Sequence, residues 1–228
     1  MADIPQAVTR HVAPHHPKLR HHFVDMEQQN ESSQLAMWLF LLTEIMFFGG
    51  LFTGYGIYRF QYAAVWAQAA RPLSVFLGGI NTAVLITSSL TMAMAVHSAQ
   101  TGKKNLLILF LILTFLFGAV FLGIKAVEYH DKYTEHLLPG YDFHPEGGEN
   151  IARGAALFYC FYFAMTGMHA LHMIIGVCII VVLLVMASKN RFSAEYHPHI
   201  EYFGLYWHFV DIIWIFLFPL LYLMGRHK

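Results

Sequence analysis

The stretch "LLILFLILTFLFGAVFLGI", residues 106–124, contains nineteen consecutive residues and no charged side chain. A helix of nineteen residues is about 28 Å long, close to the roughly 30 Å thickness of the hydrocarbon core of a bilayer. Hydrophobicity is continuous along the stretch, whereas a strand of a membrane barrel alternates with a period of two. The stretch therefore predicts a transmembrane helix, which we place at about residues 105–128.

Four other stretches are also long and apolar enough to span a bilayer. The whole chain of 228 residues is 57% hydrophobic and only 12% charged, which is unusual for a water-soluble domain of this size. The fold class expected is therefore all-α, a polytopic membrane protein with five transmembrane helices. The other four helices are expected at about residues 34–58, 73–98, 154–187 and 204–224.

Two regions differ in composition and define the expected domains. Residues 1–32 form a polar, His-rich N-terminal tail without an apolar run, so we expect no cleavable secretory signal there. Residues 33–228 form the five-helix transmembrane domain. The histidines of the tail lie beside prolines and are interpreted as part of a solvated or partner-facing arm instead of a metal site.

Charge content argues against nucleic-acid binding, and the positions of the cysteines argue against an intrachain disulfide bond. Lys plus Arg and Asp plus Glu both number 14, so the chain lacks the basic surplus typical of nucleic-acid binding. Cys160 and Cys178 lie on one predicted helix about 27 Å apart, too far for a disulfide bond.

Positive charges next to helix ends bear on orientation in the membrane. The totals on the two sides are nearly equal, but one group clusters in short loops, which favours a cytoplasmic N terminus and a periplasmic C terminus. This group, which could also hold lipid phosphates, consists of Lys103, Lys104, Lys189 and Arg191.

Ionisable residues within the predicted spans are few. A charged group near the bilayer centre costs roughly 2.5–3.5 kcal/mol or more, so each should face protein or a wet cavity and find a partner. His97, Lys125 and Glu128 lie at predicted helix ends and are expected to snorkel to the interface.

Glu44, in "LLTEIMFFGG", lies about ten residues inside its helix, too deep to snorkel. Two interpretations are open: a packing contact that holds two helices together, and an acid that handles protons or gates a path. In both cases the carboxyl group needs a hydrogen-bonding partner on a facing helix. We predict that this partner is His172 or, failing that, His169.

His169 and His172 stand three residues apart and share a helix face. They could be haem or metal ligands, hydrogen-bonding residues between helices, or partners of Glu44. A haem pair would need matching histidines on another helix, and a di-iron bundle would need several deep glutamates. We therefore predict interhelical hydrogen bonding and no metal site.

His208 and Asp211 lie one turn apart on the last predicted helix, among aromatic residues typical of a membrane interface. A local contact that neutralises the pair is expected.

Five segments along the chain form a recognisable set, namely "LLTEIMFF", "GGINTAVLITSSLTMAMAVHSA", "FLGIKAVEYHDKY", "FYFAMTGMHALHMIIGV" and "LYWHFVDIIWIFLFPLLYLMG". In this order they resemble subunit III of the haem-copper terminal oxidases, the cytochrome c oxidase subunit III family. The resemblance covers roughly residues 30–225, and the Tyr-Trp-His-Phe-Val-Asp string at 206–211 is its most specific part.

The resemblance implies an accessory subunit beside the catalytic subunit I of a respiratory enzyme that reduces O2 and pumps protons. Haem and copper would be carried by partner subunits, and this chain would bind phospholipids, support proton uptake and protect the oxidase during turnover. Direct contact with subunit I, and association with subunit II and other respiratory subunits, are implied in a bacterial inner membrane. The membrane acid of the family corresponds to Glu44, the fourth-span histidines to His169 and His172, and the other polar motif residues to Asn81, Glu128, His208 and Asp211.

Many family members have seven spans, and this chain has five. The Thr-Glu pair at 43–44 is closer to the cytochrome c oxidase pattern than to the quinol oxidase pattern, so we predict the non-catalytic subunit III of an aa3-type cytochrome c oxidase. A quinol oxidase subunit, a nitric-oxide-reductase accessory protein and an independent proton-coupled transporter are the alternatives. The face toward subunit I should contain small residues, with candidates Gly78, Gly79, Gly118, Gly123, Gly167 and Gly176.

Overall fold

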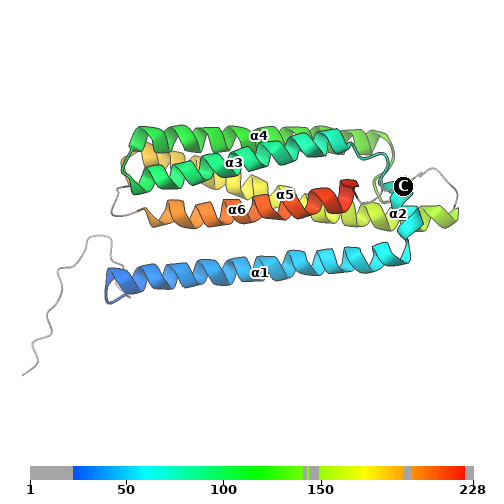
Figure 1. The fold of residues 1–228 in the computed structure, drawn as a ribbon, viewed down its shortest axis with the longest axis horizontal. Helices are drawn as coiled ribbons and strands as arrows, with labels where there is room; N and C mark the ends of the chain where they lie inside the picture. The colour runs from blue at the N-terminus through cyan, green and yellow to red at the C-terminus, as the bar shows by residue number, and fades with distance from the viewer. Residues whose placement is uncertain (1–22, 141–142, 144–148, 193–196, 224–228) are drawn as a thin grey trace, which may run out of the picture. The chain divides into compact units, whose positions relative to one another are not determined.

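The computed structural model describes residues 23–140, 143, 149–192 and 197–223, and within these ranges its regular secondary structure is entirely helical (Figure 1). Five of its helices are long and apolar enough to cross a membrane, which confirms the predicted all-α, five-span architecture. The elements are α1 (Met26–Gln61), α2 (Ala63–Ala69), α3 (Val75–Gln100), α4 (Lys104–Thr134), α5 (Glu149–Ser188), α6 (Pro198–Phe218) and the π-helical turn η1 (Pro219–Leu223).

Most of the long helices extend beyond the ranges expected from hydrophobicity. Helix α1 begins at Met26, α4 continues to Thr134 and α6 begins at Pro198, in each case six to eight residues outside the predicted span. Hydrophobicity marks only the part of a helix that lies in hydrocarbon, whereas the backbone can continue its hydrogen bonds into polar sequence. Residues 1–22 of the predicted tail, with its histidines, lie outside the described residues.

The four helices α3 to α6 form a bundle in which each helix packs on two of the others. Helices α3 and α4 form the antiparallel hairpin expected from their short connection, in which Gly102 has a φ of 69° that favours glycine. Helix α6 packs on α3 and α5, and α5 packs on α4. The short helix α2, which hydrophobicity does not predict, lies against α5, where the Trp66 indole donates a hydrogen bond to the Gly154 carbonyl at 3.0 Å.

Trp207 on α6 occupies the centre of this packing and is fully buried. A Cβ atom at Gly176 on α5 would lie 2.8 Å from its ring, and one at Gly118 on α4 would lie 3.0 Å from it. Its indole N–H donates to the Ser88 hydroxyl on α3 at 3.0 Å. One side chain therefore joins four helices, and it fits because two of them carry glycine at the contact.

Some glycines expected to face a partner subunit serve this internal packing instead. Gly118 and Gly176 contact Trp207, and a Cβ at Gly78 would lie 2.7 Å from the Phe218 ring, so the expectation is wrong for these three. Gly79 and Gly123 have nothing within 4 Å of a Cβ position and remain on the outer surface.

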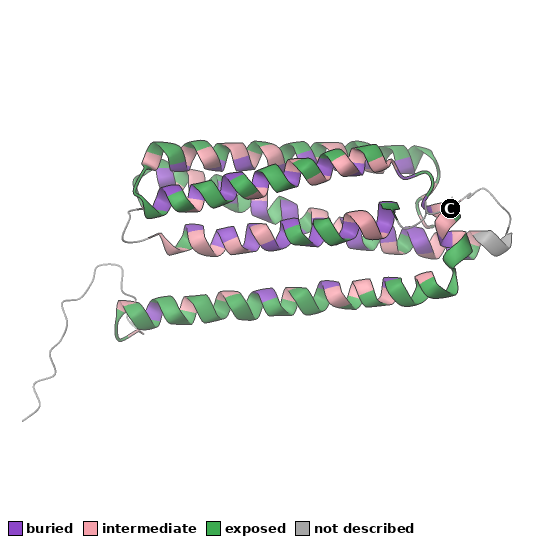
Figure 2. Cartoon of the chain, in the orientation of Figure 1, coloured by how far each residue is buried: buried purple, intermediate pink, exposed green. Residues whose placement is uncertain are grey.

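Figure 2 shows exposed residues along every long helix, and many of them are large and apolar. These include Leu90, Val182 and Phe216, each more than half exposed. Polar side chains are found inside: the Thr91 and Thr114 hydroxyls, for example, bond at 2.9 Å between α3 and α4. This distribution suits a solvent of acyl chains, in which buried hydrogen bonds help to hold helices together.

Candidate functional site

The side chains of Glu44 on α1 and His172 on α5 meet between the two helices. The Nε2 atom of His172 lies 3.1 Å from Oε2 of Glu44, and the two side chains are only 11% and 19% exposed. Phe48 packs its ring edge-on against the imidazole at a centroid distance of 5.3 Å. The pair therefore joins two spans through a polar contact covered by an aromatic ring.

The hydrogen bonds of His172 decide how many protons the pair holds. Its Nδ1 atom lies 2.8 Å from the Met168 carbonyl oxygen, which can only accept, so Nδ1 carries a hydrogen. Nε2 then either accepts a hydrogen bond from a protonated Glu44 or donates one to a carboxylate. In both forms one proton lies between the two residues and the pair has no net charge, which suits its place in the membrane.

His169 is not part of this pair. It is fully buried, and its Nε2–H donates to the Val210 carbonyl on α6 at 3.1 Å, while Nδ1 has no partner among the residues described. Its ring packs against the rings of Phe121 and Trp214, with a centroid distance of 5.3 Å in both pairs. His169 therefore joins α5 to α6, and of the two histidines only His172 reaches Glu44.

A second polar cluster surrounds Lys125 and Glu128 on α4. The Lys125 ammonium lies 2.9 Å from Oε2 of Glu128 and donates to the Tyr222 hydroxyl at 3.1 Å. Oε1 of Glu128 accepts hydrogen bonds from Tyr162 at 3.0 Å and from Tyr222 at 2.5 Å. Every charged atom of the ion pair is thus satisfied by residues of α4, α5 and η1.

Aromatic rings complete this cluster. The Lys125 ammonium lies 5.1–5.7 Å from the centroids of four rings, a distance at which the face of a ring attracts a cation. The rings belong to Tyr129, Tyr162, Trp214 and Tyr222. Lys125 and Glu128 are each 3% exposed, so the interpretation that they snorkel is wrong. Helix α4 continues past them, which places them inside the bundle instead of at its end.

Sequence reasoning missed this cluster, although one signal was present. Lys125 and Glu128 stand three residues apart with opposite charge, a spacing that puts them on one helix face. Their phenol partners lie 37 and 97 residues further along the chain from Lys125, and nothing local links them.

His208 and Asp211 do not contact each other, so the expected local pair is wrong. The Nδ1 atom of His208 forms a hydrogen bond of 2.7 Å with the Ser89 hydroxyl on α3. Asp211 is 2% exposed, and neither of its carboxyl oxygens has a partner among the described residues. Asn81 on α3 is likewise fully buried with an unpaired side-chain amide in that same set.

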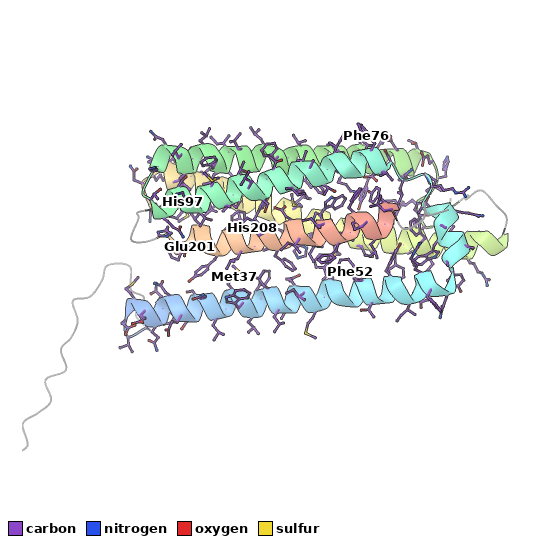
Figure 3. All side chains as sticks on the ribbon, in the orientation of Figure 1. Met37, Phe52, Phe76, His97, Glu201 and His208 are labelled. Carbon is purple, nitrogen blue, oxygen red and sulfur yellow. The ribbon has the colours of Figure 1, made fainter. Side chains whose placement is uncertain are left out.

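The basic residues predicted to lie on one side are found at one end of the bundle. The Lys104 ammonium donates to the Ser188 carbonyl at 3.0 Å, which brings the start of α4 to the end of α5. A cavity of about 280 Å³ opens here and is lined by Lys104, Ser98 and Phe192, among others. Lys103, Lys189 and Arg191, which neighbour Lys104 or Ser188 in the sequence, are exposed. His97, at the end of α3, is also exposed, as its position in the sequence predicts (Figure 3).

Within the described ranges, no group of three His, Cys, Asp or Glu side chains is arranged to hold a metal ion. Cys160 and Cys178 are both free and exposed.

Comparison with known proteins decides the family. The family model described as cytochrome c oxidase subunit III matches residues 21–136 and 147–226, nearly the whole chain. The chain belongs to the cytochrome c oxidase subunit III family. Its five apolar helices and its family make it a multi-pass membrane protein. Subunit III proteins belong to multi-subunit haem-copper oxidases, which are oxidoreductase complexes. Membership of the family therefore implies subunits I and II as partners.

Relatives of this subunit III protein come from oxidases of two kinds. It is 28% identical to the cytochrome bo(3) ubiquinol oxidase subunit 3 of Pseudomonas aeruginosa, over 96% of this chain and 97% of that one. It is 31% identical to the quinol oxidase subunit 3 of Bacillus subtilis, over 88% and 92%. It is 32% identical to the cytochrome c oxidase subunit 3 of Thermostichus vulcanus, over 84% and 87%. The family is therefore shared by quinol and cytochrome c oxidases.

The proton held between Glu44 and His172 leads to a testable difference between two substitutions. In Glu44→Gln the amide N–H can donate to Nε2 of neutral His172, so we expect the free energy of unfolding to change by less than about 1 kcal/mol. In Glu44→Leu the imidazole loses its partner, and we expect a loss of about 1–3 kcal/mol. Denaturant unfolding in detergent, followed by helical circular dichroism, measures both. Equal losses in the two variants would contradict the assigned hydrogen bond.

Proposed function

We propose that this chain is the non-catalytic subunit III of an aa3-type cytochrome c oxidase of aerobic respiration. In this proposal the chain lies in a bacterial inner membrane with its N terminus in the cytoplasm, in direct contact with subunit I. Haem and copper belong to the partner subunits.

The observation that carries the proposal is the pairing of ionisable groups inside the spans. Glu44 with His172, and Lys125 with Glu128 and its tyrosines, form neutral clusters that join helices of this one chain. A transporter or a redox protein needs polar groups that are free to meet an ion or a cofactor, whereas these two clusters are closed by residues of the same chain. Among the described buried ionisable residues of the spans, Asp211 is the exception, because neither of its carboxyl oxygens has a partner. These clusters suit a subunit that supports chemistry carried out by a neighbour.

The first test is composition. A tagged form of the full chain, purified from membranes in mild detergent, is expected to bring with it a large subunit that contains haem and copper. When the subunits of the complex are separated, the haem absorption should be found with the large subunit, and this chain alone should have no visible absorption. Purification of the chain without any haem-bearing partner would contradict the proposal.

Support for subunit I is proposed to include lipid binding, proton uptake and protection from inactivation during turnover. Glu44→Gln is the informative variant because its hydrogen bond, and hence the fold, is expected to survive. We expect this variant oxidase to assemble with normal lipid content and to lose activity sooner during sustained turnover than the wild type. An unchanged lifetime, with assembly and lipid content also as in the wild type, would remove any special role for the acid.

A matched control separates this effect from a general one. Thr53→Val changes a residue of the same helix, where the Thr53 hydroxyl donates to the Gly49 carbonyl of its own turn at 2.8 Å. Its oxidase is expected to keep the wild-type lifetime, because no interhelical contact is lost. An equal loss in both variants would indicate a structural effect of any change in α1.

The electron donor has two candidates. The Thr-Glu pair at 43–44 favours cytochrome c, whereas the Pseudomonas relative, named as a ubiquinol oxidase subunit, matches this chain over 97% of its own length. The purified complex decides between them when supplied with reduced cytochrome c and, separately, with ubiquinol. The proposal expects oxygen consumption with cytochrome c, and consumption with ubiquinol alone would favour the second candidate.

Phospholipid is proposed to bind at the end of the bundle where Lys104 lines its cavity. A lysine near an anionic leaflet contributes about 1 kcal/mol to attraction. Lys103, Lys189 and Arg191 add charge on the same side in the proposed orientation. Binding of lipid phosphate at this end is expected to weaken when the four residues are replaced by glutamine.

A further inference from the structure

The outer face formed by α3 and α6 contains a pocket of about 380 Å³ in the middle of the two helices. Three of its lining side chains are polar, namely Ser89, His208 and Asp211, and the others are aliphatic. Figure 3 places His208 on α6. The rim residues Ile86, Leu90 and Ile212 are 49–63% exposed, so the pocket opens onto the apolar surface of the subunit.

Asp211 is the unusual member of this pocket. It is 2% exposed, and neither carboxyl oxygen has a hydrogen-bond partner among the residues that the structure describes. The Ser89 hydroxyl lies close enough to interact with the Asp211 carboxyl group, but it is bonded to His208 at 2.7 Å and makes no hydrogen bond of ordinary geometry with Asp211. A buried carboxyl group without a donor is costly whether it is charged or neutral, and the cost is larger in hydrocarbon than at a wet surface. Asp211 therefore needs a hydrogen-bond donor that the described residues of this chain do not supply.

The depth of Asp211 excludes most lipid groups as that donor. Along Pro198–Leu223 it stands thirteen residues from one end and twelve from the other, about 18–20 Å of helix in each direction. Half of the hydrocarbon core is about 15 Å thick, so phospholipid headgroups remain beyond reach. Acyl chains do reach this depth, but they have no donor to offer.

The neighbouring surface of α3 suits the close approach of another helix. At helical spacing the small residues Gly79, Ala83 and Ala93 share one outward face with Ile86 and Leu90. A Cβ atom at Gly79 would meet nothing within 4 Å, so the space in front of it is open in this chain. Small residues let the backbone of a second helix come near enough for a side-chain hydrogen bond.

Resting on the proposed function, we propose that a transmembrane helix of the large catalytic subunit docks on the α3 and α6 face and donates a side-chain hydrogen bond to Asp211. A hydroxyl, indole or amide side chain on that helix supplies the donor, because each is neutral and each can enter a pocket of this volume. The aliphatic rim then packs around the bond and excludes lipid.

Photocrosslinking in the intact oxidase tests the position of the partner. Benzoylphenylalanine is placed at Ile212 on the pocket rim or, as a matched control, at Val182, which is 57% exposed on α5. We expect a covalent adduct with the large subunit from position 212 and mainly lipid adducts from position 182. Lipid adducts alone at 212, or equal protein adducts at both positions, would overturn the inference.

Substitution of Asp211 tests the hydrogen bond itself. Hydrogen bonds between membrane helices are worth about 0.6–1.7 kcal/mol, so Asp211→Leu is expected to weaken retention of this chain in the oxidase by roughly 3- to 20-fold. Asp211→Asn keeps an acceptor oxygen and should retain most of the association. The isolated Asp211→Leu chain should resist denaturant at least as well as the wild type, because it loses an unpaired carboxyl group.

The outcomes distinguish this inference from the proposed function. If the wild-type chain co-purifies with a haem-bearing large subunit but Asp211→Leu is retained as well as the wild type, the docking inference alone is overturned. If the wild-type chain co-purifies with no such subunit, both fail. Loss of retention in Asp211→Leu together with an unaltered isolated chain supports the docking face.

Discussion

Lys125→Met is expected to lower the free energy of unfolding of the chain by about 3–5 kcal/mol, the usual cost of removing one partner from a buried ion pair. Methionine has nearly the length of lysine, so the cavity left behind is small and the effect is chiefly electrostatic. Glu128 keeps the hydrogen bonds from Tyr162 and Tyr222 but loses the ammonium at 2.9 Å. Unfolding in detergent by denaturant, followed by helical circular dichroism, gives the measurement.

Two further variants make this expectation specific. Lys125→Met combined with Glu128→Gln removes the charge that would be left without compensation, so the double variant should be more stable than Lys125→Met alone. Lys104→Met removes the same charge at the end of the bundle, where the lost bond is to the Ser188 carbonyl, and should cost no more than about 1 kcal/mol. A double variant no better than the single one would mean that the ion pair is not the source of the loss.

The spans could be predicted because hydrophobicity reports directly what a bilayer requires of a helix. The same signal misplaced Lys125 and Glu128. A hydrophobicity profile ends a span where charges begin, so a buried ion pair near the end of a helix looks like an exposed one. Only the positions of Tyr162 and Tyr222, brought in from α5 and η1, show that the pair is enclosed.

The contact between Glu44 and His172 could be anticipated because depth limits the choices. An acid in the middle of a span needs a partner at the same depth, and the chain offers few polar residues there. Which of two neighbouring histidines meets Glu44 depends on the rotation of α5, and rotation is set by packing instead of by local sequence. Asp211 shows the limit of arguments from spacing. It stands three residues from His208, a spacing that puts both side chains on one helix face, yet His208 forms its hydrogen bond with Ser89 on α3.

Packing around Trp207 could not be anticipated, since the glycines that admit it were expected on the outer surface. Gly118 is on α4, Gly176 is on α5 and the ring comes from α6, so three segments far apart in sequence meet at one residue. A stripe of small residues predicts that something packs closely there. Whether the neighbour is the same chain or another one is decided by the tertiary fold.

This packing predicts opposite effects for two substitutions of glycine by alanine. A Cβ at Gly176 would lie 2.8 and 3.0 Å from atoms of the Trp207 ring, which its hydrogen bond to Ser88 and its contact with Gly118 hold in place. We therefore expect Gly176→Ala to destabilise the chain by about 1–3 kcal/mol, as overpacking does, and Gly176→Leu to destabilise it more. At Gly123, where a Cβ meets nothing within 4 Å, alanine should stabilise the helix by up to about 1 kcal/mol.

Denaturant unfolding of the full chain in detergent measures both variants under one condition. The tryptophan fluorescence of Gly176→Ala should also change, because the ring must shift to admit the methyl group, whereas the spectrum of Gly123→Ala should match the wild type. A change in the same direction in the two alanine variants would contradict the packing of Trp207, a residue of α6, against α4 and α5. Helix propensity alone favours alanine equally at both positions, so only a steric contact at Gly176 can produce opposite signs.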